Sequence, residues 1–177
     1  MSTESSETKL ATALSRRYDR RAMTLRVGDV APDIQALDHH GQLFRLSDLR
    51  GKRNLVLFFY PRAFTPGCTA EVCSFRDAYE DLRDQGTELV GVSTDGLEKQ
   101  AKFAETHRVP YPLLPDEGRV VAKAYDVIGV FRSLLGITRR VTFVIDKEGV
   151  VRGIFHHELD IGRHLVDVKK TLASLAG

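Results

Sequence analysis

The sequence predicts a layered α/β domain in which helices cover both faces of a central sheet. Strand-length apolar runs alternate with helical amphipathic stripes along most of the chain. One of these runs, residues 54–60, is apolar at every position after Asn54, as expected of a central strand buried on both faces. The composition is that of an ordinary globular protein, with 42% hydrophobic and 28% charged residues. At 177 residues, the chain can bury a core without disulfides or metals.

The first half of the chain carries a hairpin, a strand and a helix. Two short alternating runs, residues 33–37 and 43–46, flank a glycine-bearing turn and predict the hairpin. Residues 54–60 predict the central strand. The helix is expected to run on from Cys68, because apolar side chains recur at helical spacing until Gly86 ends the pattern.

The second half continues the alternation. Residues 88–92 predict a strand, residues 97–107 a helix that ends before a Pro-Tyr-Pro sequence, and residues 119–125 a short helix. Residues 140–145 and 150–155 are β-rich runs around a turn, which predicts another hairpin. A last helix is expected from a stripe of apolar residues, Leu165, Val168, Leu172 and Leu175.

This order of elements matches the plan of the thioredoxin fold, a βαβα half followed by a ββα half. In that fold the reactive cysteine begins the first long helix, which is the position of Cys68. We predict a thioredoxin fold in residues 25–177, with an N-terminal β-hairpin extension and a central insertion at residues 110–136. Residues 1–24, rich in Ser and Arg, predict a flexible tail, and their acidic residues count against a transit peptide.

Charge and cysteine content narrow the function classes. The 26 basic and 24 acidic residues give a net charge of +2, which indicates neither a nucleic-acid nor a membrane partner. Two cysteines are too few for a disulfide scaffold. No signal-peptide segment opens the chain, so we expect a cytoplasmic protein. The adjacent histidines at 39–40 and 156–157 point to opposite faces of a strand and chelate poorly, so no metal is expected.

Both cysteines, Cys68 and Cys73, lie in one short segment between the central strand and the helix. The thiolate is the reactive form, and about 3% of free cysteine is thiolate at pH 7. Making the anion dominant takes about 3.4 kcal/mol. A helix N-terminus supplies at most about 2 kcal/mol, so a cationic side chain must contribute. The sequence offers Arg62 nearby and Arg139 or Arg140 on a distant strand.

Three residues before the first cysteine suit a reactive thiol. Pro61 fixes φ where the strand ends, Gly67 permits a sharp turn of the backbone, and Thr65 places a hydroxyl in the same pocket. Each residue alone has an ordinary reading, since such a threonine is usually a helix cap and free cysteine usually packs as a small hydrophobe. Their combination around one thiol favours a reactive cysteine over a purely structural one.

The pattern Pro61-x-x-x-Thr65-x-x-Cys68 resembles the active-site motif of the peroxiredoxins. The longer match resembles the bacterioferritin comigratory protein or peroxiredoxin Q branch, and the similarity runs from about residue 28 to the C-terminus. The matching residues are Tyr60, Pro61, Thr65, Pro66, Gly67, Cys68, Thr69, Glu71 and Cys73.

The resemblance implies a thiol peroxidase without haem, flavin or metal. Cys68 would attack the peroxide O–O bond and become a sulfenic acid, which Cys73 would resolve as an intramolecular disulfide. Thr65 would hold the peroxide, Arg140 would activate the thiol, and Pro61 would shield the pocket. The substrates would be hydrogen peroxide and organic hydroperoxides, and thioredoxin or glutaredoxin would be the reductant of a monomer or weak homodimer.

Glu71 belongs to the same motif, and we expect only a local structural role for it. Substrate preference is expected to depend on apolar side chains around the pocket, such as Phe64, Phe131 and Leu134.

The spacing of Cys68 and Cys73 makes a separate prediction. Residues five apart on an ideal helix have Cα atoms about 8.7 Å apart, whereas a disulfide requires less than about 7 Å. Disulfide formation must therefore unwind residues 67–75.

Two other functions remain open. A thioredoxin-like disulfide oxidoreductase would use C-x-x-C, and the longer gap between these cysteines counts against it. A redox sensor needs the same accessible thiolate as an enzyme, so the sequence does not separate them.

Overall fold

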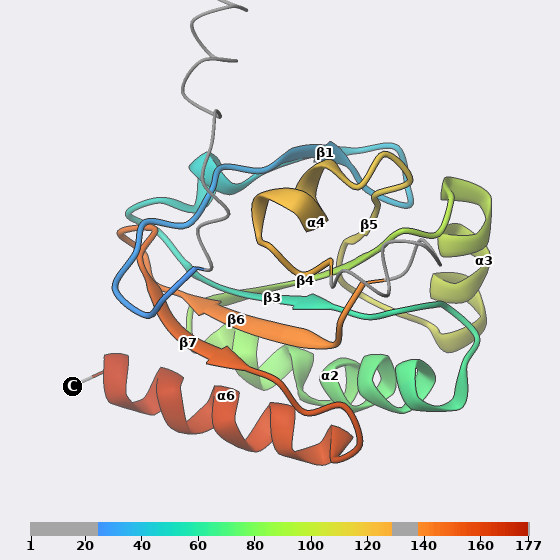
Figure 1. Ribbon diagram of the computed structural model, residues 1–177. Helices are drawn as coiled ribbons and strands as arrows, with labels where there is room; N and C mark the ends of the chain where they lie inside the picture. Colours follow the sequence, from blue (N-terminus) through green and yellow to red (C-terminus); the bar gives the residue numbers. More distant parts are fainter. Residues whose placement is uncertain (1–24, 129–137, 177) are drawn as a thin grey trace, which may run out of the picture.

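A computed structural model describes residues 25–128 and 138–176. A five-stranded sheet in the order β5-β4-β3-β6-β7 lies at its centre (Figure 1). The strands are β3 (Asn54–Phe59), β4 (Thr87–Ser93), β5 (Leu113–Pro115), β6 (Val141–Ile145) and β7 (Val151–Phe155). The helices are the 3-10 helix η1 (Leu46–Leu49), α2 (Pro66–Asp84), α3 (Leu97–His107), α4 (Val120–Ala124) and α6 (Ile161–Leu175). The expected tail, residues 1–24, lies outside the described residues.

The sheet has mixed strand directions. The central strand β3 is parallel to β4 and antiparallel to β6, with Leu57 opposite Val90 on one side and Phe143 on the other. The β6–β7 hairpin is antiparallel, as the sequence predicted, and β5 extends the other edge parallel to β4. This arrangement confirms the predicted thioredoxin-type α/β fold.

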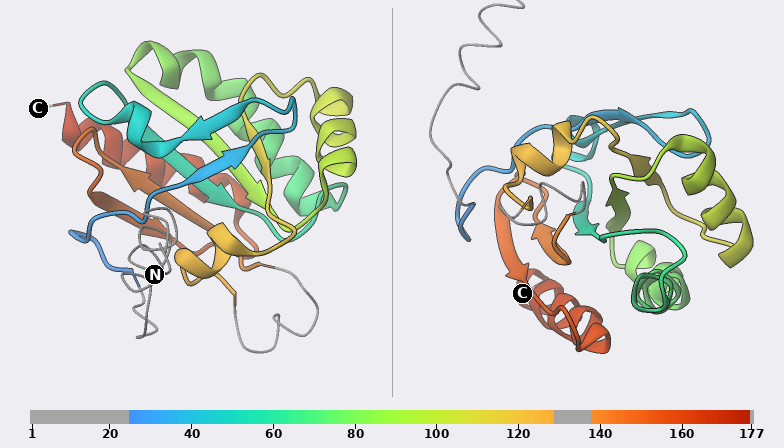
Figure 2. Two further views of the ribbon diagram at one scale, coloured as in Figure 1. Left: turned by 90° about the horizontal axis from the view of Figure 1, so that it is seen from above. Right: turned by 45° about the vertical axis from the view of Figure 1, so that its right-hand side comes forward.

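Alternation along β3 divides the core into two parts. Val56 and Phe58 pack toward α2, α3 and α6. Leu57 and Phe59 pack on the other face, with residues of α4 and β6. These four side chains are fully buried, and each contributes about 1.5–3 kcal/mol on burial. Helices therefore cover both faces, with α2 and α6 below the sheet and α4 above it in Figure 1, and the views of Figure 2 show the same layers.

The N-terminal hairpin forms as expected. Strands β1 (Gln35–Leu37) and β2 (Leu43–Arg45) pair antiparallel in a separate two-stranded sheet. The turn between them contains Gly41 at φ 76°, a conformation that glycine adopts without steric cost. The hairpin lies on the same side of the main sheet as α4 (Figure 1).

One strand was not expected. The segment treated as a central insertion contributes β5, only three residues long, to the edge of the main sheet. Its leucines, Leu113 and Leu114, are fully buried on opposite faces. A three-residue strand that follows one proline and ends in another has too few residues to show a period. Residues 129–137 of the same segment, with Phe131 and Leu134, lie outside the described part of the chain.

None of the helices in the described ranges is both long enough and apolar enough to cross a membrane.

Candidate active site

Cys68 lies in the first turn of α2, at the carboxyl end of the central strand. The chain leaves β3, forms a short loop and enters α2 at Pro66. The end of β3 is fixed because the Tyr60 N–H donates to the Val92 carbonyl (3.1 Å) and the Thr138 hydroxyl donates to the Tyr60 carbonyl (3.1 Å). The Cys68 side chain is 1% exposed. The thiol is thus buried at the end of a helix that carries partial positive charge.

The loop between β3 and α2 is anchored from β4 and α3. The Ala63 N–H donates to Asp95 Oδ2 at 2.7 Å. Asp95 is held in turn by the Ser93 hydroxyl at 2.8 Å and by Lys99 Nζ at 2.5 Å. The next residue, Phe64, adopts φ 65°, which is uncommon for a residue other than glycine. These contacts fix the path of the backbone leading to Cys68.

Pro61 and Thr65 lie on this loop and are both half-buried. Thr65 is the N-cap residue of α2, but its side chain makes no capping hydrogen bond. Its hydroxyl instead donates to the Arg62 carbonyl at 3.0 Å. The ordinary reading of this threonine as a side-chain cap is therefore wrong. Its oxygen retains accepting capacity at the edge of the site.

Arg140 is the cationic side chain at the thiol. Its Nη2 lies 3.4 Å from Cys68 Sγ, and the residue is 5% exposed. Arg140 directly precedes β6, which begins at Val141 and so starts one residue later than expected. Arg139 and Arg62 are both exposed. The geometry therefore selects Arg140 from the arginines that the sequence offered.

Gly67 serves a different purpose from the one expected. It lies within α2 and is not among the residues with positive φ, so no sharp turn requires it. A Cβ at this position would come within 3.2 Å of Arg140 Nη2 and 3.1 Å of Ile161 Cδ1. The absent side chain makes room for the guanidinium beside Cys68.

Glu71 belongs to the site, although we expected only a local structural role for it. It follows Cys68 by three residues on α2, so the two side chains share a helix face. Arg140 Nη1 donates to Glu71 Oε2, and Arg140 thus bridges the carboxylate and the thiol. Burial raises the pKa of Glu71 to about 7, against the opposing charge of Arg140. The helical spacing could have revealed the shared face, but not the partner.

A buried histidine lies next to this pair. His164 Nε2 donates to the His157 carbonyl at 2.9 Å, so Nδ1 accepts from the Thr142 hydroxyl at 2.8 Å. Burial lowers the pKa of His164 to about 4, and the ring is neutral. Its Nε2 lies 3.9 Å from Glu71 Oε1, an oxygen without a hydrogen-bond partner among the described residues. No motif identified His164, because it stands nearly a hundred residues away from Glu71.

Cys73 lies farther along α2 and is half-buried. Both cysteines are free thiols within the same helix, which is the arrangement that prevents a direct bond between them. Cys73 Sγ lies 3.9 Å from His107 Nδ1.

The adjacent histidines serve structural contacts. His39 Nδ1 accepts from the Leu113 N–H at 3.1 Å, and His157 Nε2 lies 2.7 Å from Asp167 Oδ2. Within residues 25–128 and 138–176, no three His, Cys, Asp or Glu side chains gather where a metal ion could bind.

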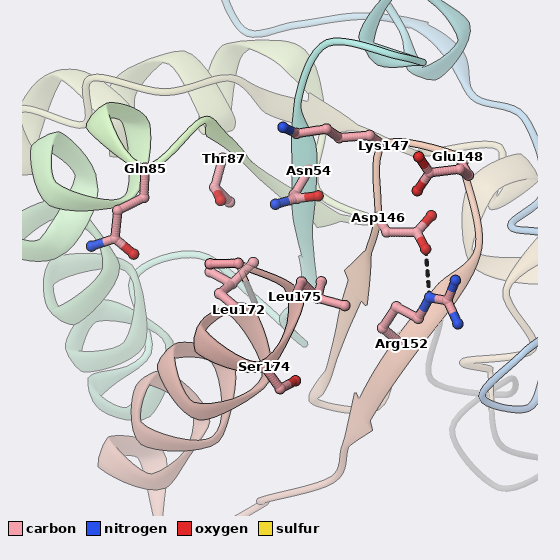
Figure 3. Close-up of a pocket in the computed structure, with 11 residues that line it drawn as sticks. Asn54, Gln85, Thr87, Asp146, Lys147, Glu148, Arg152, Leu172, Ser174 and Leu175 are labelled. Carbon is pink, nitrogen blue, oxygen red and sulfur yellow. Dashed lines mark hydrogen bonds and ion pairs between the residues drawn. The ribbon is translucent and has the colours of Figure 1, made fainter.

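A separate hollow lies at the opposite end of the sheet (Figure 3). It has a volume of about 540 Å³ and is lined by Asn54, Thr87 and the end of α6. Asp146 and Arg152, which form an ion pair, also line this hollow. Asn54 and Thr87 begin β3 and β4, whereas Cys68 follows the last residue of β3. This hollow therefore lies away from the thiol and contains no cysteine.

The fold and the buried thiol beside a guanidinium define a thiol-dependent redox protein of the thioredoxin fold. Residues 27–154 match the AhpC/TSA family, so the chain belongs to the AhpC/TSA family.

Individual relatives are similar over much of their length. The chain is 44% identical over 131 residues to peroxiredoxin Bcp of Bacillus subtilis, covering 72% of this chain and 82% of that protein. It is 38% identical over 149 residues to chloroplastic peroxiredoxin Q of Triticum aestivum, covering 84% of this chain and 67% of that protein. The crystal structure of peroxidoxin BcpB from Mycobacterium tuberculosis has a TM-score of 0.78 and 40% identity, covering 85% of this chain and 98% of that one. These names confirm the resemblance to the bacterioferritin comigratory protein and peroxiredoxin Q branch.

Proposed function

We propose that this chain is a thiol-dependent peroxidase in which Cys68 reduces hydrogen peroxide and organic hydroperoxides. The observation that carries the proposal is the 3.4 Å contact between Arg140 Nη2 and Cys68 Sγ at the start of α2. The positive guanidinium and the helix N-terminus both stabilise the thiolate. The names of the relatives, peroxiredoxin Bcp and peroxiredoxin Q, support the same activity.

The peroxidatic step follows from these groups. The Cys68 thiolate attacks one peroxide oxygen, the O–O bond breaks, and the departing alkoxide or hydroxide takes a proton to leave as alcohol or water. Sulfur is oxidised to sulfenic acid and the peroxide is reduced. Arg140 faces the charge that moves from sulfur to oxygen and stabilises it in the transition state. Thr65 orients the peroxide through its hydroxyl, and Pro61 shields the pocket from water.

Cys73 resolves the sulfenic acid. Its sulfur displaces hydroxide from Cys68 and forms an intramolecular disulfide, and the proton lost by the Cys73 thiol balances the hydroxide as water. Both cysteines lie in α2, so the helix must unwind over residues 67–75 for the sulfurs to meet. A disulfide that closes so short a loop at the expense of helix is readily reduced.

A dithiol protein completes the cycle by thiol–disulfide exchange. Thioredoxin or glutaredoxin fits this role, since each supplies the two thiols that the exchange consumes. No further cofactor takes part in the reaction. The proposed setting is the cytoplasm, where glutathione and thioredoxin keep thiols reduced, and the proposed state is a monomer or weak homodimer.

Competition with horseradish peroxidase for hydrogen peroxide tests the proposal. The chain contains no Trp, so its own fluorescence is a poor probe of fast oxidation, whereas the haem absorbance of the competitor is a strong one. The wild-type chain should protect the competitor from oxidation, and Cys68→Ser should not. Cys73→Ser is the matched control, because it retains the first step. A wild-type rate no faster than that of an ordinary thiol would overturn the peroxidase proposal and favour a redox sensor.

A further inference from the structure

We propose that His107 is a positioning and proton-accepting residue for Cys73. This inference rests on the resolving role proposed above and adds a residue that the motif does not contain. His107 is the last residue of α3, on a different element from either cysteine. Its Nδ1 lies 3.9 Å from Cys73 Sγ, which is within hydrogen-bonding reach for sulfur.

The imidazole packs against two aromatic rings. Its ring packs edge-on against Phe103, with the ring centroids 4.8 Å apart, and lies 6.2 Å from the Phe64 ring. The backbone carbonyl of His107 accepts a hydrogen bond from Arg76 Nη1 at 2.8 Å. Arg76 lies three residues after Cys73 on α2, so this bond joins the helix that carries the thiol to the end of α3. The end of α3 is therefore tied to α2 beside Cys73, and the ring of His107 packs against Phe103 and Phe64.

Three charged or titratable side chains interact with Cys73, namely His107, Arg76 and Tyr111. His107 faces it from α3. Arg76 is next to it on α2 and pairs with Asp77 at 2.7 Å. Tyr111 interacts with it electrostatically, and burial raises the pKa of this phenol well above its usual value, so the hydroxyl stays protonated. Arg76 keeps its charge throughout the physiological range. The group in this set with a ring nitrogen that can accept a hydrogen bond or a proton from the thiol is the imidazole.

These contacts define what His107 does. In the reduced chain, the Cys73 thiol donates to Nδ1; when the thiol ionises, Nδ1 accepts its proton and the resulting imidazolium stabilises the thiolate. The thiolate attacks Cys68 Sγ of the sulfenic acid, the S–O bond breaks, and the released hydroxide takes up one proton to become water. The reaction needs no oxidant beyond the peroxide already consumed, and His107 returns its proton to solvent.

Alkylation of Cys73 by iodoacetamide across pH 6–9.5 tests this role directly. The experiment uses the full chain carrying Cys68→Ser, so that a single thiol reacts. His107→Phe keeps the ring packing but removes the nitrogen, and His107→Gln keeps a polar group if the first variant folds poorly. His40→Gln, at an exposed position, is the control. We expect both His107 variants, but not the control, to move the pH midpoint of alkylation upward by about one unit.

Such a shift has opposite effects on rate at low and high pH. A midpoint higher by about one unit lowers the thiolate fraction about tenfold, while the more basic thiolate is about threefold more nucleophilic. The His107 variants should therefore alkylate about threefold more slowly at neutral pH and faster than the parent above both midpoints. A structural defect alone would not reverse its sign with pH. Unchanged midpoints in both variants would overturn the inference.

A second measurement separates this inference from the proposed function. With both cysteines present, the His107 variants should react with peroxide at the wild-type rate, while a sulfenic-acid trap captures Cys68 for about threefold longer at neutral pH. A slow first reaction in the wild-type chain would remove the peroxidase proposal without touching the alkylation result. A normal first reaction with unchanged alkylation midpoints would remove the His107 role alone.

Discussion

Replacing Glu71 by Gln should change how the stability of the protein depends on pH. The pKa of Glu71 rises from 4.5 to about 7 on folding, so the folded state binds a proton more tightly between these values. Stability from this group is therefore highest below pH 4.5 and is lost as the pH rises toward 7. A difference of about 2.5 pH units at 1.36 kcal/mol per unit corresponds to about 3 kcal/mol.

His164 acts in the opposite direction. Its pKa falls from 6.5 to about 4 on folding, so the unfolded state binds the proton more tightly. Its contribution to stability is lost as the pH falls from 6.5 toward 4 and amounts to about 3 kcal/mol. In the wild-type protein the contributions of Glu71 and His164 therefore largely cancel between pH 4.5 and 6.5.

The two variants should break this balance with opposite signs. As the pH rises from 4.5 to 7, Glu71→Gln should gain about 3 kcal/mol of unfolding free energy relative to wild type. As the pH rises from 4.5 to 6.5, His164→Gln should lose about 3 kcal/mol relative to wild type. Both variants should be destabilised overall, because each leaves a buried partner unsatisfied. Urea unfolding of the reduced protein, followed by circular dichroism at constant ionic strength, gives the free energies. Differences from wild type that stay constant with pH would refute the reasoning.

Three further predictions concern the thiols and their surroundings. Arg140→Lys keeps the positive charge but loses the planar guanidinium, whose two nitrogens contact a carboxylate and a thiol at once. Peroxide reduction should therefore slow about 100-fold in the competition assay. An unchanged rate would contradict the role of the guanidinium geometry. Gly67→Ala should displace the same guanidinium by a few tenths of an ångström and slow the reaction while leaving the helix stable, and a crystal structure with Arg140 unmoved would rule this out. Cys73→Ser should complete one round of peroxide reduction and leave a trappable sulfenic acid on Cys68. Hydrogen exchange of residues 67–75 should increase on oxidation of the wild-type chain and not on oxidation of this variant. Unchanged protection of residues 67–75 in the oxidised wild-type chain would exclude unwinding.

Long periodic segments were predictable from the sequence. The helix at Leu97–His107 has the predicted bounds, and the central strand and the first long helix differ by one or two residues at their ends. These segments carry enough apolar positions to show a period of two or 3.6. Strand β5 could not be found in the same way, because its three residues gain their stability from β4 and from burial on both faces.

The site was predictable where it is local and not where it is assembled by the fold. Cys68 and Thr65 follow from the spacing along one segment. Glu71 and His164 come from distant parts of the chain, and their contact depends on how α6 packs against α2. Arg139 and Arg140 are neighbours that differ by the side of the backbone from which they project, and only the structure gives that side. The reason for Gly67 was also invisible, since the atom it makes room for belongs to a residue more than seventy positions away.

The place of Glu71 between the two cysteines has a consequence for the whole cycle. If the first turns of α2 unwind to join the sulfurs, as proposed, Glu71 also leaves Arg140, and this buried guanidinium loses its carboxylate partner. The proposed mechanism thus makes the arrangement that binds peroxide and the arrangement that forms the disulfide two alternative states of one segment. After reduction of that disulfide, attraction between Arg140 and Glu71 would favour the return of the helix to the arrangement seen in this structure.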